Sequence, residues 1–451
     1  MGRYVVVGNG VAGTRAAEVL RLRRPDAEIV VLTEEPYPFY RRPQLADFAA
    51  GSISEARLWA KRDAFYTEQR IELRLSSRVE SVDAAAGTVT LAAGETLGYD
   101  GLLVATGRSA IDGGVAGGGA VGVNHFKTLA DAQAVRAVTR DGKTGVVYGN
   151  GLASLEMVRA LTSGGFATTY VVPTARLWPD VLDEDAAAII VSRVRATGAE
   201  LVLGVTAEAI TGGAGGMSEI HLAGGRTVGA DVVGVCAGYA PAAEWLPGGG
   251  ASFAVDQVFV TPWPGIWGAG DVTESGGSLG FNWLRSWRHG AAAAASMLGE
   301  ASQGREEVDV LDTAVLGLSV VALGKTTVAY RSGFSEMRGE YPYAEFYKKL
   351  VFDPDDVLVG ALLLGNVAEA AALEEAIRAK TRRSALDEAL LHQMFDVTYR
   401  VPFAGVQCPV CRHEFPVGTD AKEGDRVTCP VCGMEFMLAN GPQGFIARAA
   451  K

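Results

Sequence analysis

The chain has 451 residues, of which 48% are hydrophobic and 21% are charged, and its formal net charge is −11. This length predicts two to four domains. An acidic balance of this size argues against nucleic acid or an anionic membrane as the main partner. The sequence contains no run of the roughly 18 apolar residues that a membrane-spanning helix requires. It enters a strand-forming segment at once, without a signal peptide, so we expect a cytoplasmic protein.

The opening of the chain carries the pattern of a dinucleotide-binding fold. Strand-forming residues 4–7 precede Gly8, Gly10 and Gly13, and a helical pattern follows. In such a unit the first glycine makes the turn, the second lets the backbone approach a pyrophosphate, and the third lets the helix pack on the strand. Glu34 follows the next predicted strand, where an acid binds ribose hydroxyls. The alternative is a glycine turn that binds no ligand.

A second, weaker copy of this pattern begins after residue 144. Gly149 and Gly151 follow an apolar strand, but Ser154 occupies the position of the third glycine. Serine is small enough for close packing of helix and strand, so we expect the site to be weakened and not lost. Pro173 stands where an acid would bind the ribose, and Arg176 lies three residues further on.

Other polar residues lie where a cofactor would bind. Asp271 ends a Gly-Ala-Gly-Asp turn that contains Gly270 and follows an apolar strand, which places its carboxylate at the carboxyl edge of a sheet. Arg42 lies in a proline-rich loop, where it either contacts a cofactor phosphate or stacks on Tyr40 at the surface. For His289, before an alanine-rich helix, an ordinary packing role is favoured over catalysis.

Together these motifs resemble the FAD- and NAD(P)-dependent pyridine nucleotide oxidoreductases. The two glycine motifs, the Ala-Thr-Gly turn at residues 105–107 and the turn that ends in Asp271 carry the resemblance. Residues 34–45 fit the pattern E-x-P-x-x-x-Y-x-R-P-x-L. This pattern resembles the corresponding loop in one branch of the family, which contains the flavin part of nitrite reductases, the rubredoxin reductases and the ferredoxin reductases. The resemblance covers about residues 3–372.

The resemblance implies FAD at the first motif and NAD(P)H at the second. The residues implied to contact FAD are Gly8, Gly10, Gly13, Glu34, Arg42, Thr106, Gly107, Gly270 and Asp271. Those implied to contact NAD(P)H are Gly149 and Gly151, with Glu156 near the nicotinamide. The fold class implied is α/β, with two Rossmann-like, three-layer nucleotide-binding domains and a small α+β C-terminal domain.

The chain departs from the family pattern in three places. Asp47 stands where a lysine near the flavin is common, and Pro173 replaces the acid that follows the second strand of the NAD domain. No cysteine occurs before residue 109, where disulfide reductases of this fold carry their redox pair. The absence of an adjacent thiol pair favours a one-electron acceptor, such as an iron–sulfur or rubredoxin-type protein, over a disulfide.

The C-terminal tail predicts a metal site. Cys408 and Cys411 form one C-x-x-C pair, and Cys429 and Cys432 form another about 17 residues later. Two such pairs supply four thiolates to one tetrahedral ion. The even repeat resembles a zinc ribbon that binds a partner protein, with a rubredoxin-like iron centre or a dithiol as alternatives.

The predicted domains follow from these motifs. We expect an FAD domain at residues 1–110 and 231–308, an NAD(P) domain at 111–230, a small reductase domain at 309–372, a helical linker at 373–403 and a zinc-ribbon tail at 404–451. The predicted function is an FAD-dependent NAD(P)H oxidoreductase for a redox protein or iron–sulfur subunit, alone or in a larger complex. The alternative is a non-catalytic flavoprotein scaffold whose ribbon recruits a partner.

Overall fold

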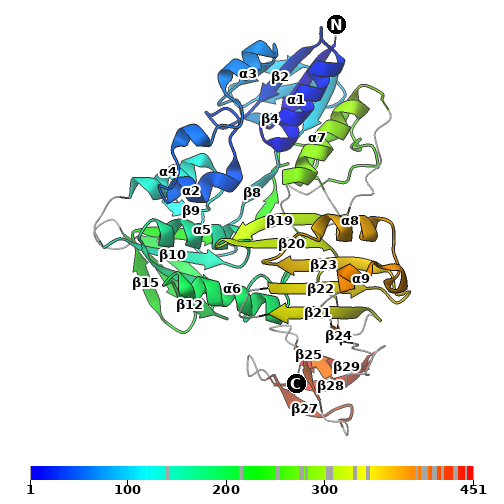
Figure 1. The fold of residues 1–451 in the computed structure, drawn as a ribbon. Helices are drawn as coiled ribbons and strands as arrows, with labels where there is room; N and C mark the ends of the chain where they lie inside the picture. Colours follow the sequence, from blue (N-terminus) through cyan, green and yellow to red (C-terminus); the bar gives the residue numbers. More distant parts are fainter. Residues whose placement is uncertain are drawn as a thin grey trace. The chain divides into compact units, whose positions relative to one another are not determined.

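A computed structural model shows how these segments fold (Figure 1). It describes residues 2–120, 122–138, 142–212, 217–249, 253–273, 279, 283–300, 308–328, 333–341, 346–391, 395–397, 405–408, 414–417, 421–429, 435–441 and 444–449. The chain divides into two compact units. The first comprises Met1–Tyr170, Val194–Glu200 and Ala207–Leu311, and the second comprises Val171–Arg193, Leu201–Thr206 and Asp312–Lys451.

The first unit contains a five-stranded sheet in the order β18-β7-β1-β2-β3. Its strands are β1 (Arg3–Val7), β2 (Glu28–Leu32), β3 (Glu72–Arg74), β7 (Gly101–Val104) and β18 (Ile266–Gly268). All four neighbouring pairs are parallel. Because helices cover both faces of a parallel sheet, the central strands β7, β1 and β2 are mostly apolar, and Val5, Val6 and Val31 are completely buried. The edge strand β3 has the sequence Glu-Leu-Arg and is partly exposed.

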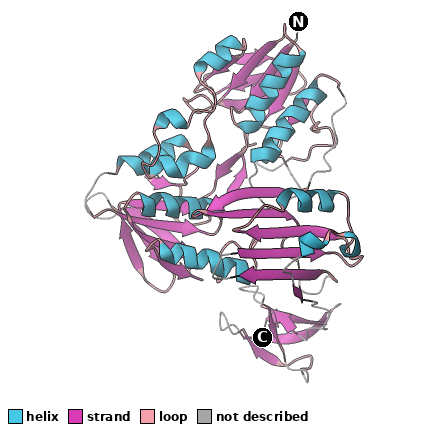
Figure 2. Ribbon diagram, viewed as in Figure 1, coloured by secondary structure: helices cyan, strands magenta, loops and turns pink. Residues whose placement is uncertain are grey.

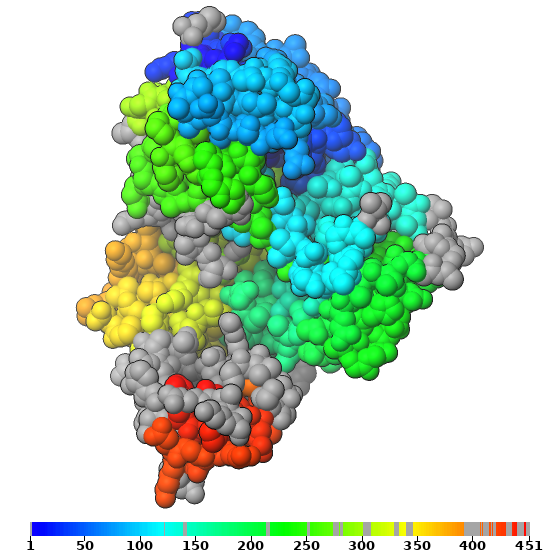
Figure 3. Space-filling model, turned by 180° about the vertical axis from the view of Figure 1, so that it is seen from behind, coloured from blue at the N-terminus to red at the C-terminus, as the bar shows by residue number. Residues whose placement is uncertain are grey.

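Two helices from distant parts of the sequence pack side by side in this unit. Helix α1 (Val11–Arg23) follows β1, and α7 (Trp283–Met297) follows β18; Figures 1 and 2 show them next to each other. In the space-filling view, the blue N-terminal segments and the yellow-green segment that ends in α7 form one continuous surface (Figure 3). An α/β fold with parallel sheets is therefore confirmed.

Smaller elements complete this part of the unit. An antiparallel meander is formed by β4 (Val79–Asp83), β5 (Thr88–Leu91) and β6 (Thr96–Gly98). Two short helices, α2 (Leu45–Ala49) and α3 (Asp63–Glu68), lie between β2 and β3 in the sequence.

A second sheet has the order β12-β11-β10-β16-β9. It consists of β9 (Val123–Asn124), β10 (Thr144–Gly149), β11 (Ala167–Val172), β12 (Glu200–Leu203) and β16 (Val232–Cys236). Strand β10 is parallel to β16, and β16 is parallel to β9. The helices α4 (Leu129–Ala137), α5 (Leu152–Ser163) and α6 (Glu184–Ala196) alternate with these strands, and the strands β13 (Ala207–Gly212), β14 (Ser218–Leu222) and β15 (Thr227–Ala230) form an antiparallel meander. A two-stranded antiparallel pair joins β8 (Arg108–Ala110) to β17 (Tyr239–Pro241).

The second unit is built on a six-stranded sheet in the order β19-β20-β23-β22-β21-β24. The strands are β19 (Val310–Val315), β20 (Leu318–Gly324), β21 (Ser335–Tyr341), β22 (Phe346–Phe352), β23 (Leu358–Leu364) and β24 (Phe395–Val397). The helical pattern expected after residue 372 appears as α8 (Ala370–Arg378) and α9 (Glu388–Leu391). Both helices contribute buried leucines, Leu373 and Leu390.

The tail forms two small antiparallel sheets. One pairs β25 (Gly405–Gln407) with β26 (Glu414–Pro416), and the other contains β27 (Arg426–Thr428), β28 (Glu435–Gly441) and β29 (Gly444–Ala449). Each C-x-x-C pair begins directly after a short strand, because Cys408 follows β25 and Cys429 follows β27. Among the helices that the structure describes, none has the length and apolar character needed to cross a membrane.

Candidate cofactor sites

A cavity of about 930 Å³ lies at the carboxyl edge of the first parallel sheet. Residues at or just after the ends of β1, β2, β7 and β18 line it, which is where ligands bind in open parallel sheets. All residues implied to contact FAD line this cavity except Gly13: Gly8, Gly10, Glu34, Arg42, Thr106, Gly107, Gly270 and Asp271. The structure thus brings together residues from four separate stretches of the sequence.

The three glycines of the first motif have different surroundings. Gly8 has a φ of +112°, and a Cβ there would lie 2.2 Å from the carbonyl oxygen of Ala105. A Cβ on Gly13 would lie 1.9 Å from the carbonyl oxygen of Gly8. By contrast, a Cβ on Gly10 would meet no atom within 4 Å, because this residue faces open space in the cavity. Gly8 and Gly13 are needed for packing, and Gly10 leaves room for a ligand.

This arrangement fits a cofactor with a diphosphate group. Helix α1 begins at Val11, so its first N–H groups and the positive end of its dipole lie beside Gly10. No side chain caps this helix end. A helix N-terminus combined with an open glycine backbone forms an anion site.

Arg42 and its neighbours form a hydrogen-bonded group on the cavity wall. The Arg42 guanidinium lies 4.9 Å from the centre of the Tyr40 ring and 2.5 Å from the Glu35 carboxylate. The Tyr40 hydroxyl donates to the other Glu35 oxygen at 2.7 Å, and burial raises the pKa of Tyr40, which keeps that proton in place. Arg42 therefore both stacks on Tyr40 and lines the cavity. Glu35, which the sequence reasoning missed, is paired, whereas Glu34 is exposed at the cavity.

Lys127 is a further cation on the cavity wall that the sequence reasoning missed. Its carbonyl accepts a 2.8 Å hydrogen bond from Arg42, and its ammonium lies 4.8 Å from the centre of the Tyr239 ring. Burial, and next the charge of Arg42, lowers the pKa of Lys127 to about 8. The sequence contains one usable signal: Thr128 and Asp131 form a capping box that starts α4, which places Lys127 in the loop just before a helix.

Both the side chain and the main-chain carbonyl of Asp271 have hydrogen-bonding or ion-pair partners. Its carboxylate oxygen lies 3.3 Å from the Ser286 hydroxyl and 3.4 Å from the Arg285 guanidinium, while its carbonyl accepts a 2.9 Å bond from Arg108. The predicted position at the end of an apolar strand is confirmed, because β18 ends three residues earlier. His289 is buried against Phe259 and is not among the residues that line the cavity, which agrees with a packing role.

The second glycine motif is braced by its serine. Ser154 is completely buried, and its hydroxyl lies 2.8 Å from the carbonyl oxygen of Gly151 and 2.7 Å from the Tyr170 hydroxyl. The Gly151 N–H donates to the same hydroxyl at 3.1 Å. A Cβ on Gly149 would lie 2.3 Å from the carbonyl oxygen of Cys236. The serine therefore fits the close packing of this turn.

A chain of charges links α2 to α5 within the first unit. The Arg159 guanidinium forms an ion pair with Asp47 and a second one, at 2.7 Å, with Glu156. Burial raises the pKa of Glu156, and Arg159 opposes that shift. The position where the resemblance expects a lysine thus carries an acid whose partner is an arginine from the second motif's helix.

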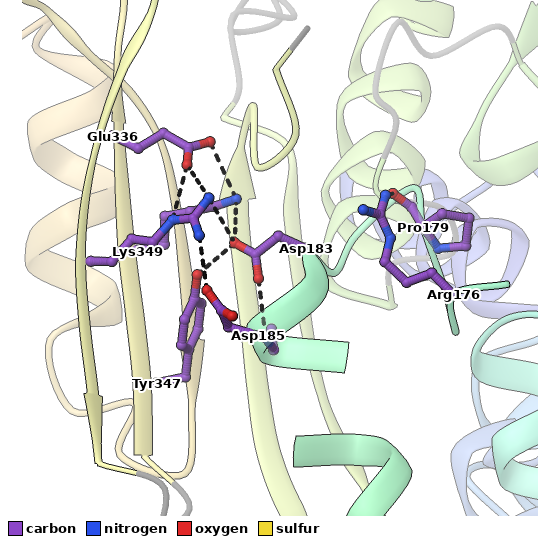
Figure 4. Close-up of polar contacts among 9 residues, drawn as sticks. Arg176, Pro179, Asp183, Asp185, Glu336, Tyr347 and Lys349 are labelled. Atoms are coloured by element: carbon purple, nitrogen blue, oxygen red, sulfur yellow. Dashed lines mark hydrogen bonds and ion pairs between the residues drawn. The ribbon is translucent and has the colours of Figure 1, made fainter. Parts of the chain in front are cut away.

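In the second unit, the loop after β11 is tied to the six-stranded sheet (Figure 4). Arg176 donates to the carbonyl of Pro179 at 3.3 Å within this loop. Asp183, which accepts a 3.1 Å hydrogen bond from the N–H of Ala186 in the first turn of α6, lies 2.7 Å from the Lys349 ammonium. The end of this loop is therefore anchored to β22 through Lys349.

Around Asp183, several further charged and polar side chains converge. The Tyr347 hydroxyl donates to the Asp183 carboxylate at 2.5 Å, and Lys349 also lies 3.5 Å from Glu336. Arg338 pairs with Glu336 at 2.6 Å. Burial alone would raise the pKa of Asp183, but the charge of Lys349 and the hydrogen bonds that Asp183 accepts together lower it, so this carboxyl is ionised.

The metal site predicted in the tail is described only in part. Cys408 and Cys429 are both buried in one small core cluster with Phe415 and Phe436, whose ring centres are 5.9 Å apart. Their partners in the C-x-x-C pairs, Cys411 and Cys432, lie outside the described residues. Among the residues that are described, no group of three or more potential metal ligands occurs.

Comparison with known proteins adds family relationships to this geometry. Residues 2–295 match the model of the family described as pyridine nucleotide-disulphide oxidoreductase. The chain is 34% identical to the ferredoxin–NAD(+) reductase component of the anthranilate 1,2-dioxygenase system of Burkholderia cepacia, over 72% of this chain and 84% of that protein.

It is 29% identical to the assimilatory nitrate reductase electron transfer subunit of Bacillus subtilis, over 81% of this chain but only 48% of that relative's length. Among solved structures, the ferredoxin reductase for the CYP199A2 system of Rhodopseudomonas palustris aligns with a TM-score of 0.76. That alignment covers 86% of this chain and 98% of the other at 21% identity, and it supports the fold.

Proposed function

The chain belongs to the pyridine nucleotide-disulphide oxidoreductase family, and we propose that this FAD-dependent NAD(P)H oxidoreductase passes single electrons to an iron–sulfur or rubredoxin-type protein. The observation that carries the proposal is the cavity at the first motif, whose Gly10 faces open space beside the start of α1. FAD would supply the conversion between a two-electron hydride donor and a one-electron acceptor.

Each part of the cavity has a role in this proposal. Gly10 and the first N–H groups of α1 bind the diphosphate, and Glu34 binds the adenosine ribose. Arg42 adds positive charge on the diphosphate or flavin side, and Asp271 binds the ribityl chain. At the second motif, Gly149 and Gly151 bind the diphosphate of NAD(P)H, and Glu156 orients the nicotinamide. Holding the two bound cofactors in a reactive orientation lowers the barrier to hydride transfer, and no side-chain nucleophile is required.

A relay through a disulfide beside the flavin is disfavoured by the cysteine positions. The first cysteine of the chain is Cys236, and it is buried in β16 with its sulfur 3.9 Å from the sulfur of Met157. Burial raises the pKa of this thiol, which keeps it unreactive. Electrons therefore leave to an external acceptor, as the similarity to a ferredoxin–NAD(+) reductase component and to an electron transfer subunit also suggests.

The domain assignment is part of the proposal. Residues 1–110 and 231–308 bind FAD, residues 111–230 bind NAD(P)H, and residues 309–372 form the small reductase domain, which the helices of residues 373–403 follow. Residues 404–451 form a ribbon in which Cys408, Cys411, Cys429 and Cys432 hold one zinc ion and which binds a protein partner. The burial of Cys408 and Cys429 in one cluster supports a shared ion.

The alternative is a flavoprotein scaffold that recruits a partner without catalysis. Anaerobic addition of NADH, and then of NADPH, to the purified yellow protein separates the two. We expect rapid bleaching of the visible flavin absorption, followed by recovery when an oxidised iron–sulfur protein is added. A protein that keeps its FAD but is bleached by neither nucleotide would be a scaffold.

A further inference from the structure

Three exposed apolar residues gather at the start of α7 in the first unit. Trp283, Leu284 and Trp287 are 38%, 44% and 41% exposed, and we call these three residues the tryptophan patch. They fall on one face of the helix, because 3.6 residues complete a turn. Single exposed apolar residues are common, but a cluster that includes two tryptophans is typical of a surface that binds another protein.

Trp283 connects the patch to the cofactor cavity. Its ring stacks on Phe39, with ring centres 5.5 Å apart and planes inclined by 20°. Phe39 is buried and lines the cavity, as does Ser286 on the inner side of α7. A protein bound at the patch would therefore be separated from the cavity by two stacked rings.

Basic residues border the patch. The Arg15 guanidinium lies 4.2 Å from the centre of the Trp287 ring, and Arg288 follows Trp287 in the helix. Arg15 and Lys61 share one acid, Glu18, at 3.1 and 2.7 Å. The backbone N–H of Lys61 donates to the carbonyl of Phe39 at 3.0 Å, which places this lysine beside the stacked rings of Phe39 and Trp283. These four charged residues have a net positive charge on a chain whose total is −11.

We infer that the tryptophan patch, with the basic rim of Arg15, Lys61 and Arg288, is the docking surface for an acidic iron–sulfur protein that accepts electrons from this oxidoreductase. The inference rests on the proposed function. An apolar centre with a charged rim is the usual anatomy of a protein interface. The rim steers an acidic partner to this place on a protein whose net charge is negative, and the tryptophans hold it there.

A second copy of this chain is a poorer occupant for the patch. In a two-fold symmetric contact the same surface meets itself, so the two basic rims would lie opposite each other. With an acidic partner the charges are complementary. In the overall reaction, one NAD(P)H loses a hydride and two ferric centres on two partner proteins each gain one electron, giving NAD(P)⁺, two ferrous centres and one proton.

The test compares three variants of the full-length holoprotein. Leu284→Glu places an acid in the patch, Arg15→Gln removes a rim charge, and Leu22→Glu is the matched control, since Leu22 is 75% exposed on α1. NADH-driven reduction of an acidic [2Fe–2S] ferredoxin and of a rubredoxin is compared with that of ferricyanide. We expect Leu284→Glu to raise KM for the iron–sulfur protein about tenfold, with ferricyanide reduction and FAD content unchanged. Arg15→Gln should make KM for the iron–sulfur protein less sensitive to salt concentration. Leu22→Glu should behave as wild type.

Three results would count against the inference, and they are distinguishable. If the wild type reduces an iron–sulfur protein and Leu284→Glu matches Leu22→Glu, the docking surface is wrong while the proposed function stands. If the wild type sediments as a dimer that Leu284→Glu dissociates, the patch is a contact between copies. If the wild type reduces ferricyanide but neither iron–sulfur protein, the proposed acceptor is wrong, and the inference that the patch binds such a protein fails with it.

Discussion

Asp47 on α2 is ion-paired with Arg159 on α5, so the segment after the first nucleotide motif is tied to the helix of the second. Arg159 also binds Glu156, which lies one turn before it on α5. The resemblance leads one to expect a lysine at position 47, near the flavin. This chain has an aspartate there, and the positive charge comes from Arg159 on α5, the helix of the second motif. Arg159 thereby holds the carboxylates of Asp47 and Glu156 in place together.

Replacing Arg159 with methionine should impair reduction by NADH. Burial already raises the pKa of Glu156, and loss of the arginine removes the charge that opposes this shift. In this variant Glu156 loses its proton only at higher pH, so the rate of flavin reduction by NADH should fall as pH decreases. We expect kcat/KM for NADH to drop about tenfold at neutral pH and to recover partly in alkaline buffer, measured by stopped-flow bleaching of the flavin. Arg159→Lys should restore most of the activity, and a pH profile unchanged in Arg159→Met would contradict this role.

Gly10→Val should abolish FAD binding while leaving the fold intact. The added side chain meets no protein atom near its Cβ but enters the space assigned to the diphosphate, and the backbone at Gly10 is extended, which valine tolerates. FAD content per chain and thermal unfolding followed by circular dichroism measure the two effects. Gly13→Ala is the contrasting variant, because its Cβ would collide with the Gly8 carbonyl and lower stability itself. A Gly10→Val protein with a full complement of FAD would refute the assignment.

FAD affinity should weaken as pH rises through about 8. Burial and the nearby Arg42 lower the pKa of Lys127 to about 8, so its ammonium is charged below this pH and neutral above it. A charged Lys127 attracts the anionic cofactor, and this attraction is lost on the alkaline side. Fluorescence titration of apoprotein with FAD between pH 7 and 9 should show the decline in wild type and a flatter curve in Lys127→Met. If FAD affinity declines equally with pH in the two proteins, Lys127 is not the group that causes the pH dependence.

NADH and NADPH should be used with little discrimination, with a slight preference for NADH. Pro173 supplies no acid to repel a 2′-phosphate. Arg176 could attract that phosphate, but only weakly, because its guanidinium also donates to the carbonyl of Pro179 in its own loop. The measurement is kcat/KM for both nucleotides in wild type and Arg176→Ala, where the variant should lose activity mainly with NADPH. A preference above ~100-fold for either nucleotide, worth about 2.7 kcal/mol, would reveal a specificity device outside these residues.

Deletion of residues 404–451 should leave FAD binding and dye reduction by NAD(P)H intact. About fifty residues with a small core depend on their metal for folding, and zinc has no accessible redox change. Elemental analysis of the full chain should give one zinc and no iron. A red protein with one iron per chain, bleached by NAD(P)H through the flavin, would instead make the tail an electron relay.

The parts of the cofactor site that follow from local backbone geometry could be predicted from the sequence. Gly8, Gly10 and Asp271 each follow a predicted strand, and parallel strands carry such residues to one edge. Lys127 and Arg159 could not be found in this way. Arg42 reaches Lys127 across 85 positions, and Asp47 reaches Arg159 across 112. These contacts depend on how loops approach each other, which hydrophobic periodicity does not report.

Strand β22 carries two adjacent, almost completely buried lysines that point to opposite faces of the sheet. Lys348 meets Glu369 and the carbonyl of Leu390 on one face, and Lys349 meets Asp183 and Glu336 on the other. A slip of β22 by one residue would turn each lysine to the wrong face and leave buried charges without partners. Since breaking one buried ion pair costs about 3–5 kcal/mol, the two lysines select a single pairing register. Misaligned sheets are thereby rejected during folding, a safeguard that an all-apolar strand would lack.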